Sequence, residues 1–412
     1  MKQLELSEPV VIAQNTTEPI LFGGYQDPMI HCDTDGTLFV RFSGRRDDYD
    51  AYGNEHKNPL YRSADGGKTW ERDEDLDDWV RSVRPLPNGD RLLMREHLCL
   101  KEFPSLPPLP EERKGHLACC IVRDVYTVDE LTPILGDRVA KEFLADRIEA
   151  GSDRIVRDVC KVNWKNMPVH VSPGYLLRVW PNNDYRADKD GVLWMPVQGA
   201  YIAEDGSCPT KYCCTHLLRS DDFGHTWDYV STVEYLPSFG KPGATAVEGF
   251  IEAALEILEN GRMLMLLRSG SMLPVAGTGG KEHPAPALFC TLSDDRGKTW
   301  CKPFPFFEYG VRPFSVRLGD TVLMTSGRPG VYIRATDDPA GERWDDVVQV
   351  LPVPEADYYD RYFEYSCSNN GICAADDSTA FLTYSDFTRT DAEGKRAKSI
   401  LVRKIRVSPK NS

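Results

Sequence analysis

The sequence predicts an all-β protein built from small repeated sheets, a β-propeller, and two observations predict it. Six short apolar runs typical of strands are spread along the 412 residues, and nearly all follow a turn signal. In addition, the pattern S-x-D-x-G-x-T-W occurs three times, as SADGGKTW (63–70), SDDFGHTW (220–227) and SDDRGKTW (293–300). Repeats spaced by tens of residues indicate a solenoid or a propeller, and several strands per repeat favour the propeller.

The six apolar runs are predicted to be strands of separate turn-plus-strand units. Turn sequences such as Asp35–Gly36 and Asn260–Gly261 precede them. The runs lie at residues 37–42, 91–96, 191–197, 262–269, 321–327 and 379–386.

The repeated octapeptide is explained by folding alone. Its Asp carboxylate can accept backbone N–H groups in a tight turn, and its Gly can take a positive φ. Its Trp can pack between neighbouring sheets. The segment RATDDPAGERW (334–344) is interpreted as a fourth, degenerate copy that ends at Trp344.

A long gap between the first two copies predicts an insertion. The first and second copies start 157 residues apart (220 − 63), whereas the second and third start 73 apart (293 − 220). The insertion spans about 97–160, begins Pro-rich, and then has apolar residues at roughly helical spacing over 129–152. We therefore expect a single domain over 1–412 with a partly helical insertion, which either covers the pocket, forms a homo-oligomer contact or packs on the side.

Composition and charge exclude several classes of partner. The net charge of −14 disfavours nucleic acid and anionic membranes, which both attract a basic surface. The N-terminus has no apolar signal region, and no run of 18 apolar residues occurs, so a cytoplasmic protein without membrane contact is expected. The 12 cysteines include no C-x-x-C pair and no zinc spacing with histidine, so we expect reduced thiols and neither metal nor cofactor.

The octapeptides resemble the Asp-boxes of sialidases and related BNR-repeat proteins, which are six-bladed β-propellers, and the resemblance covers most of the chain apart from the insertion. It implies a retaining glycosidase with a Tyr nucleophile, which a Glu activates by taking its proton. It also implies an Asp acid/base and three Arg that hold the substrate carboxylate, because guanidinium matches carboxylate bidentately.

The segment FIEAALEILENGRMLMLLRS (250–269) is similar to the family's sequence of Glu, Leu-rich strand, turn, strand and Arg. The resemblance implies Glu252 as the base that activates the Tyr and Arg268 as a carboxylate-binding residue. Glu248 and Glu256 are alternatives for the base.

Two later segments match the remaining family positions. TSGRPGVYIRATDD resembles the segment with another Arg of the clamp, which implies Arg328, whereas Arg334 fits an outer strand. YFEYSCSNNGICAADDSTAFLTYSD resembles the last blade with the nucleophile, which implies Tyr365, with Tyr362 and Tyr384 as alternatives.

The first blade departs from the family pattern. Tyr25 and Pro28 match a Tyr-Arg-Ile-Pro type motif, but Gln26 holds the place of the Arg. A Gln amide cannot form the charged bidentate clamp, so the identity of the acidic sugar is open. Arg45 or Arg46 could compensate.

The loop that follows is expected to carry the acid/base residue, with Asp50 as first choice and Asp47 and Asp48 as alternatives. Together these residues predict an exo-glycosidase that hydrolyses a terminal acidic sugar of a small oligosaccharide. The alternatives are a propeller that binds carbohydrate or a partner without catalysis, and a lyase or isomerase that uses the same pocket.

Overall fold

The computed structural model describes residues 2–17, 20, 24–43, 59–73, 80, 83–94, 104–118, 121–172, 175–181, 184–239, 248–270, 287–358 and 361–409. The chain divides into two compact units. Unit 1 comprises Met1–Pro85, Leu258–Asn260 and Tyr309–Ser412, and unit 2 comprises Leu86–Ile257 and Gly261–Glu308. Strands dominate both units, which confirms the predicted mostly-β fold. The single domain over 1–412 stays a prediction.

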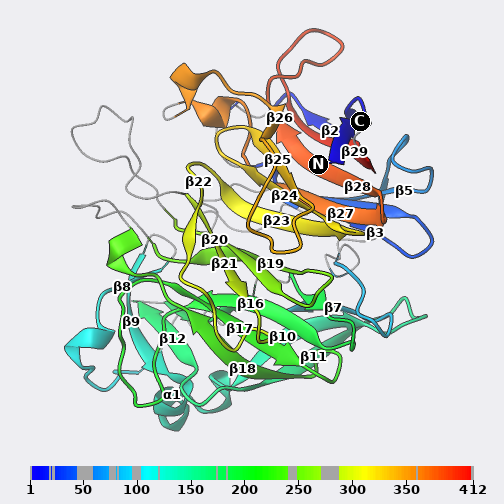
Figure 1. Cartoon of the computed structure of the whole chain (residues 1–412). Helices are drawn as coiled ribbons and strands as arrows, with labels where there is room; N and C mark the ends of the chain where they lie inside the picture. The colour runs from blue at the N-terminus through cyan, green and yellow to red at the C-terminus, as the bar shows by residue number, and fades with distance from the viewer. Residues whose placement is uncertain are drawn as a thin grey trace. The chain divides into compact units, whose positions relative to one another are not determined.

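In the part of unit 1 that the structure describes, there are three sheets with antiparallel neighbours (Figure 1). The first is β3 (Gln26–Cys32), β4 (Leu38–Ser43), β5 (Leu60–Ser63) and β6 (Glu71–Asp73). The second is β23 (Val311–Leu318), β24 (Thr321–Gly327), β25 (Val331–Thr336) and β26 (Val348–Leu351). The third is β27 (Asn370–Asp376), β28 (Thr379–Asp386) and β29 (Lys398–Pro409), with β1 (Lys2–Leu6) and β2 (Val10–Asn15).

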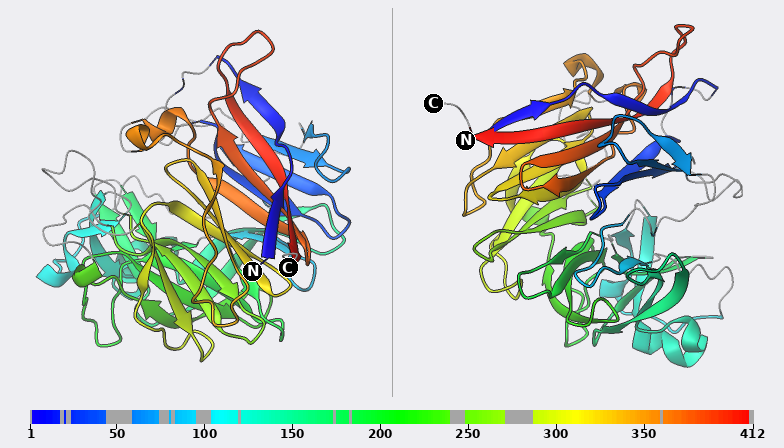
Figure 2. Two further views of the ribbon diagram at one scale, coloured as in Figure 1. Left: turned by 45° about the horizontal axis from the view of Figure 1, so that its top comes forward. Right: turned by 90° about the vertical axis from the view of Figure 1, so that its right-hand side faces the viewer.

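The two ends of the chain meet in that third sheet. Strands β1 and β2 both pair antiparallel with the long strand β29, with Lys2 opposite Pro409 (Figure 2). Every residue of β28 is buried between β27 and β29. The N-terminal strands are therefore part of the last sheet in sequence order, and they contribute to its stability.

Unit 2 also contains three sheets among the described residues. One is β19 (Ile251–Ile257), β20 (Met263–Arg268), β21 (Leu288–Ser293) and β22 (Phe304–Phe307). A second is β13 (Tyr175–Arg178), β12 (Pro168–Ser172), β9 (Ile121–Thr127) and β8 (His116–Ala118). The largest runs β14 (Trp180–Pro181), β16 (Leu193–Gly199), β17 (Cys214–Ser220), β18 (Thr226–Val233), β11 (Ile155–Asn163), β10 (Glu142–Ile148) and β7 (Arg91–Met94), with β15 (Arg186–Ala187) beside β16.

All six strand predictions are confirmed. The predicted apolar runs correspond to β4, β7, β16, β20, β24 and β28. Their residues are largely buried, so the prediction worked because these strands carry continuous apolar sequence; five of them lie inside their sheets, and β7 is the last strand of its sheet.

Among its described residues, the insertion contains one α-helix, α1 (Val128–Leu135). A capping box begins it, in which the Thr127 side chain accepts from the Glu130 N–H and the Glu130 side chain accepts from the Thr127 N–H. It ends at Gly136, which has φ 61°. The helix is therefore short, although the sequence suggested helical spacing over 129–152.

The prediction of helical structure is wrong for the second half of the segment 129–152. Phe143, Leu144 and Ile148 lie in β10, which pairs with both β7 and β11. Phe143 is buried whereas Leu144 is exposed, as the alternation of a strand requires. The apolar spacing over this short stretch fits the period of a helix as well as that of a strand. The chain forms β-structure here because the helix ends at the glycine turn and β10 pairs with its neighbours.

The Asp-boxes act as turns, as predicted. In the three full copies the Ser hydroxyl accepts from the Gly N–H and the Asp carboxylate accepts from the Thr N–H, all at 2.8–3.0 Å. The indole of Trp227 donates to the Gly224 carbonyl at 3.0 Å. Trp344 donates to the Gly341 carbonyl in the same way, at 3.2 Å, which confirms the fourth copy.

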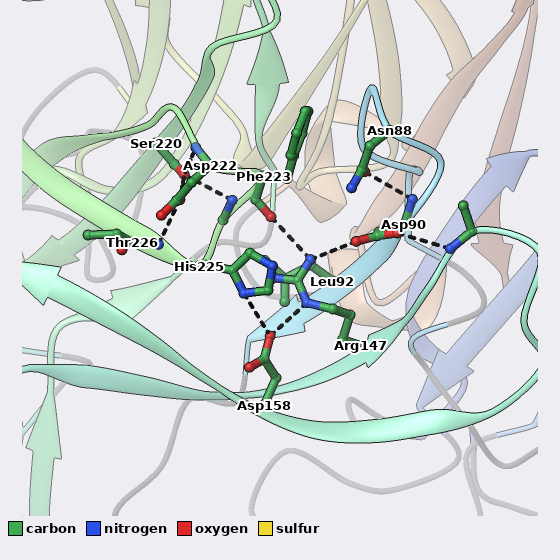
Figure 3. A network of polar contacts seen from close by, with 12 residues as sticks. Asn88, Asp90, Leu92, Arg147, Asp158, Ser220, Asp222, Phe223, His225 and Thr226 are labelled. Atoms are coloured by element: carbon green, nitrogen blue, oxygen red, sulfur yellow. Dashed lines mark hydrogen bonds and ion pairs between the residues drawn. The ribbon is translucent and has the colours of Figure 1, made fainter.

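A buried arginine connects the second Asp-box to the insertion strands (Figure 3). Arg147 of β10 donates to the Phe223 carbonyl of the box and to Asp90 Oδ2, both at 3.1 Å. Its Nε donates to Asp158 Oδ2 of β11 at 2.6 Å, and His225 Nδ1 lies 3.6 Å from the same oxygen. The carboxylates of Asp90 and Asp158 neutralise the buried Arg147 guanidinium, because a charge buried alone would be costly.

Candidate functional site

Positive φ angles at non-glycine residues concentrate at one end of several sheets. Among the described residues, two of the eight such positions, Phe223 and Arg296, belong to Asp-box turns. The other six are Tyr25, Asp27, Glu252, Arg312, Arg328 and Ser368. Each lies at or beside the start of the first strand of its sheet in sequence order, or in the turn after the second strand. Such strained backbone clusters at functional sites.

The first strands of three sheets share the same local irregularity of the backbone. In β3, β19 and β23 the second residue has a positive φ, namely Asp27 (50°), Glu252 (47°) and Arg312 (39°). In each strand that residue and the next oppose a single residue of the neighbouring strand, which is a β-bulge. Bulges re-aim side chains and are frequent beside active sites.

The register places the predicted residues at the equivalent end of their own sheets. Gln26 pairs with Ser43, Ile251 with Arg268, and Val311 with Gly327. The start of the first strand therefore lies beside the end of the second in all three sheets. Glu252 comes directly after Ile251, which brings it to Arg268.

Glu252 and Arg268 form an ion pair within unit 2. Arg268 Nη1 lies 2.6 Å from Glu252 Oε2. The Glu252 side chain is 28% exposed and that of Arg268 is 13% exposed, so the pair is partly desolvated yet accessible. The Glu252 N–H also donates to the Gln198 amide oxygen at 2.5 Å, which fixes the strained residue. The structure thus brings together two residues that lie 16 positions apart in sequence.

The two alternatives for the base, Glu248 and Glu256, are both buried and in contact with other parts of the protein. Glu256 is buried and paired with Arg186 at 3.2 Å, an arginine that also pairs with Asp184. Glu248 is buried as well, and it packs so closely on Gly270 that a Cβ there would lie 2.6 Å from the Glu248 Cβ. Both positions agree better with a structural role than with contact to a substrate.

Gln26 is buried at the start of β3, and its neighbour Asp27 holds an arginine. Asp27 Oδ1 accepts from Arg312 Nη1 at 2.8 Å and from the Asn369 amide. The three residues belong to β3, β23 and the segment before β27, and sequence reasoning missed them. The available signal was the pairing of Asp27 and Arg312 with a following proline, which is the shared bulge sequence.

Arg328 lies in the turn between β24 and β25, with φ 60°. Its guanidinium carbon is 5.2 Å from the centroid of the Tyr362 ring, a cation–π contact. Arg334 lies on the third strand, β25, and donates through Nε to the Asp345 carbonyl at 3.3 Å. Arg334 thus lies on a strand between β24 and β26, outside the first two strands of the sheet.

Tyr365 directs its hydroxyl at a carboxylate. The Tyr365 Oη donates to Asp357 Oδ2 at 2.5 Å, and this hydrogen bond raises the pKa of the phenol. Asp357 is therefore placed to accept the phenol proton, a role that the sequence analysis assigned to Glu252, with Glu248 and Glu256 as alternatives. The alternative Tyr384 is buried, and burial raises its pKa to about 12.

The first-blade loop cannot be placed. Asp50, its alternatives Asp47 and Asp48, and the candidate substrate ligands Arg45 and Arg46 all lie outside the described residues. Their roles stay predictions.

Within the described ranges, no group of three or more His, Cys, Asp or Glu side chains is arranged to hold a metal ion. In the same ranges, no helix is long and apolar enough to cross a membrane.

The BNR/Asp-box repeat family model matches residues 61–72, which include the first octapeptide, and this confirms the predicted repeat. No match to a curated protein sequence is found.

Several solved structures resemble the chain. A protein of unknown function from Dyadobacter fermentans DSM 18053 matches with a TM-score of 0.56 and 18% identity over 98% of this chain and 99% of its own. An alpha-L-arabinanase of Penicillium chrysogenum, solved with arabinobiose, matches with a TM-score of 0.47 and 16% identity over 96% and 98%. The Trypanosoma rangeli sialidase with sialic acid matches with a TM-score of 0.49 and 14% identity over 96% of this chain. The chain spans 58% of that sialidase.

The family-model match covers one Asp-box repeat of this chain. The likeness to the Dyadobacter fermentans protein concerns the fold.

Proposed function

We propose that this protein is a sialidase-like exo-glycosidase that removes a terminal acidic sugar with retention of configuration. The observation that carries the proposal is the strained backbone at Glu252 and Arg328, together with the Glu252–Arg268 ion pair. These positions were selected on sequence as site residues, and nothing in strand formation requires positive φ there. A six-bladed propeller is the architecture in which we expect the sheets to be combined.

In the proposed reaction the Tyr365 oxygen attacks the anomeric carbon and the bond to the leaving oxygen breaks. The phenol proton passes to a carboxylate, for which Asp357 is within hydrogen-bond distance and Glu252 is the residue implied by the resemblance. Asp50 would protonate the leaving oxygen. Asp50 would then activate the water that releases the sugar from Tyr365, so two displacements give net retention.

Substrate binding would differ from a three-arginine clamp. Arg268 and Arg328 offer guanidinium groups, whereas Gln26 offers only an uncharged amide. Loss of one charge-assisted hydrogen-bond pair lowers affinity by about 1.5–3 kcal/mol, so a sugar with a less tightly held carboxylate is the expected substrate. We further propose a cytoplasmic protein that takes small oligosaccharides and forms a homo-oligomer through the insertion.

The proposal is tested by hydrolysis of a panel of aryl glycosides that includes sialic and uronic acid donors. Tyr365→Phe and Glu252→Gln should each lower kcat by about 100-fold or more, because the nucleophile and the proton transfer are lost. Tyr61→Phe and Glu71→Gln change the same residue types on β5 and β6 and should leave kcat unchanged. Full activity in both site variants would exclude the proposed roles.

A non-catalytic carbohydrate-binding protein is the second candidate, and Gln26 favours it because the first clamp position lacks a charge. It predicts saturable binding of an acidic sugar with no turnover of any panel member. A lyase or isomerase would instead convert the acidic sugar into a product that differs from the hydrolysed one by mass or configuration.

A further inference from the structure

Unit 1 contains a groove of about 520 Å³ whose lining includes Tyr365 and whose other residues have no role in the proposed chemistry. It is open to solvent on one side and is formed by the end of β28, by β26 and β29, and by the link between β1 and β2. Its lining combines arginines, carboxylates, phenols and prolines, and the residues used below are Glu8, Tyr365, Tyr384, Asp386, Arg389 and Arg403.

The two arginines of the groove are held in place through their Nε atoms. Arg389 Nε donates to Asp386 Oδ2 at 3.0 Å, and the Asp386 side chain is only 4% exposed. Asp386 is fixed in turn by the Thr388 N–H and hydroxyl, at 2.8 and 2.6 Å. Arg403 Nε donates to the Ser7 carbonyl at 2.7 Å. Anchoring through Nε orients each guanidinium, and the Arg403 side chain is also hydrogen-bonded to Tyr384. An oriented guanidinium favours bidentate binding of a carboxylate.

The charge on Arg403 is the one that a ligand can neutralise. Arg389 is already paired with Asp386, whereas Arg403 contacts a neutral carbonyl and makes no ion pair with a described carboxylate. Arg403 also acts on the Tyr384 phenol, because its charge opposes the rise in the Tyr384 pKa that burial causes. A carboxylate bound here would gain a partly buried positive partner.

The other groups of the lining suit a sugar ring. The Tyr365 ring, with Pro9 and Pro352, provides an apolar surface against which the C–H face of a pyranose can pack. The Glu8 carboxylate can accept hydrogen bonds from sugar hydroxyls. Glu8 and Asp386 also make the four charged groups of the lining sum to zero, so a multiply charged anion such as a phosphate ester is disfavoured.

We propose that this groove binds a sugar that carries a single carboxylate, with Arg403 and Arg389 holding the carboxylate. The inference deepens the proposed function, because Tyr365 belongs to both, and it rests on that function only for the statement that the sugar is a substrate or product. Its test is a binding measurement, so the groove and the hydrolysis can fail separately.

The experiment is a calorimetric titration of the full chain with glucuronate, N-acetylneuraminate and uncharged glucose. At least one acidic sugar should bind, while glucose should bind at least tenfold more weakly. Arg403→Gln should weaken binding of the acidic sugar by about tenfold or more, since a charge-assisted bond is lost. Arg62→Gln serves as the matched control, because Arg62 lies on β5 with a side chain 56% exposed.

A second variant separates binding from folding. Arg403→Lys keeps the positive charge and should weaken binding less than Arg403→Gln, with the thermal midpoint of each variant measured in parallel. Equal affinity of the wild type and Arg403→Gln, or equal affinity for glucose and the acidic sugars, would overturn the groove assignment. If those results accompany full loss of hydrolysis in Tyr365→Phe, the proposed function stands and the groove alone is rejected.

Discussion

Single residues show where the sequence was informative and where it was not. Glu252, Arg268 and Arg328 were selected from motifs, and the structure gives all three unusual geometry or pairing. Asp27 and Arg312 were missed, because a following proline is their shared local signal and their ion pair joins residues 285 positions apart. The Asp357 partner of Tyr365 was missed for a different reason, since a short 3-10 turn presents it rather than a strand.

Asp90 provides a prediction at the residue scale. Burial alone would raise its pKa, but hydrogen bonds from the Ala150 N–H, Asn88 and Arg147 outweigh burial and hold the pKa below its usual value. A lowered folded-state pKa stabilises the fold above the unfolded-state pKa, near 3.9, and that stabilisation is lost as the pH falls through the folded-state value. Asp90→Asn should therefore destabilise the protein by about 2 kcal/mol at pH 7.

The same difference should shrink below about pH 4, where the unfolded wild-type chain binds a proton at Asp90, and it should be lost below the folded-state pKa. Urea unfolding of both proteins at pH 7, 5 and 3.5 measures it. Asp137→Asn, at an exposed position after α1, is the matched control and should show no such trend. A destabilisation that stays constant over this range would contradict the assigned role of the Asp90 charge.

At the scale of elements, apolar runs and turn signals identified six strands correctly. In the insertion, by contrast, the spacing of apolar residues predicted a helix where the chain forms a strand. Phe143, Leu144 and Ile148 are spaced acceptably for a helix, and only pairing with β7 and β11 makes them a strand. Such pairing partners lie tens of residues away, so no window of sequence contains them. The Asp-boxes were predictable because every contact of the turn lies within eight residues.

The Asp-box tryptophans supply the prediction at this scale. Trp227 is fully buried in the core around β7, β10 and β11, whereas Trp70 is only partly buried. Trp227→Ala should cost about 3–5 kcal/mol, and Trp70→Ala should cost clearly less because a smaller apolar area is lost. Chemical denaturation compares the two, and equal losses would contradict the view that the second box fastens the core of unit 2.

At the scale of the whole molecule, the central claim is that a sialidase-like fold carries out a two-step displacement at a tyrosine. The motif order along the chain predicted this chemistry. Glu252 and Arg268 in unit 2, and Arg328 in unit 1, lie at or beside the ends of strands. Folding alone does not require Glu252, Arg268, Arg328 and Tyr365 in that order, since function depends on sites and not on the fold. The chemistry, rather than the architecture, therefore needs the decisive test.

The most direct measurement is trapping of the covalent intermediate. The protein is incubated with an activated donor of the sugar that the panel identifies, fluorinated next to the anomeric carbon, and the labelled peptide is located by mass spectrometry. We predict one sugar per chain, bound to Tyr365, and no label in Tyr365→Phe. A label on a carboxylate such as Glu252, or release of product with inverted configuration and no label, would contradict the account.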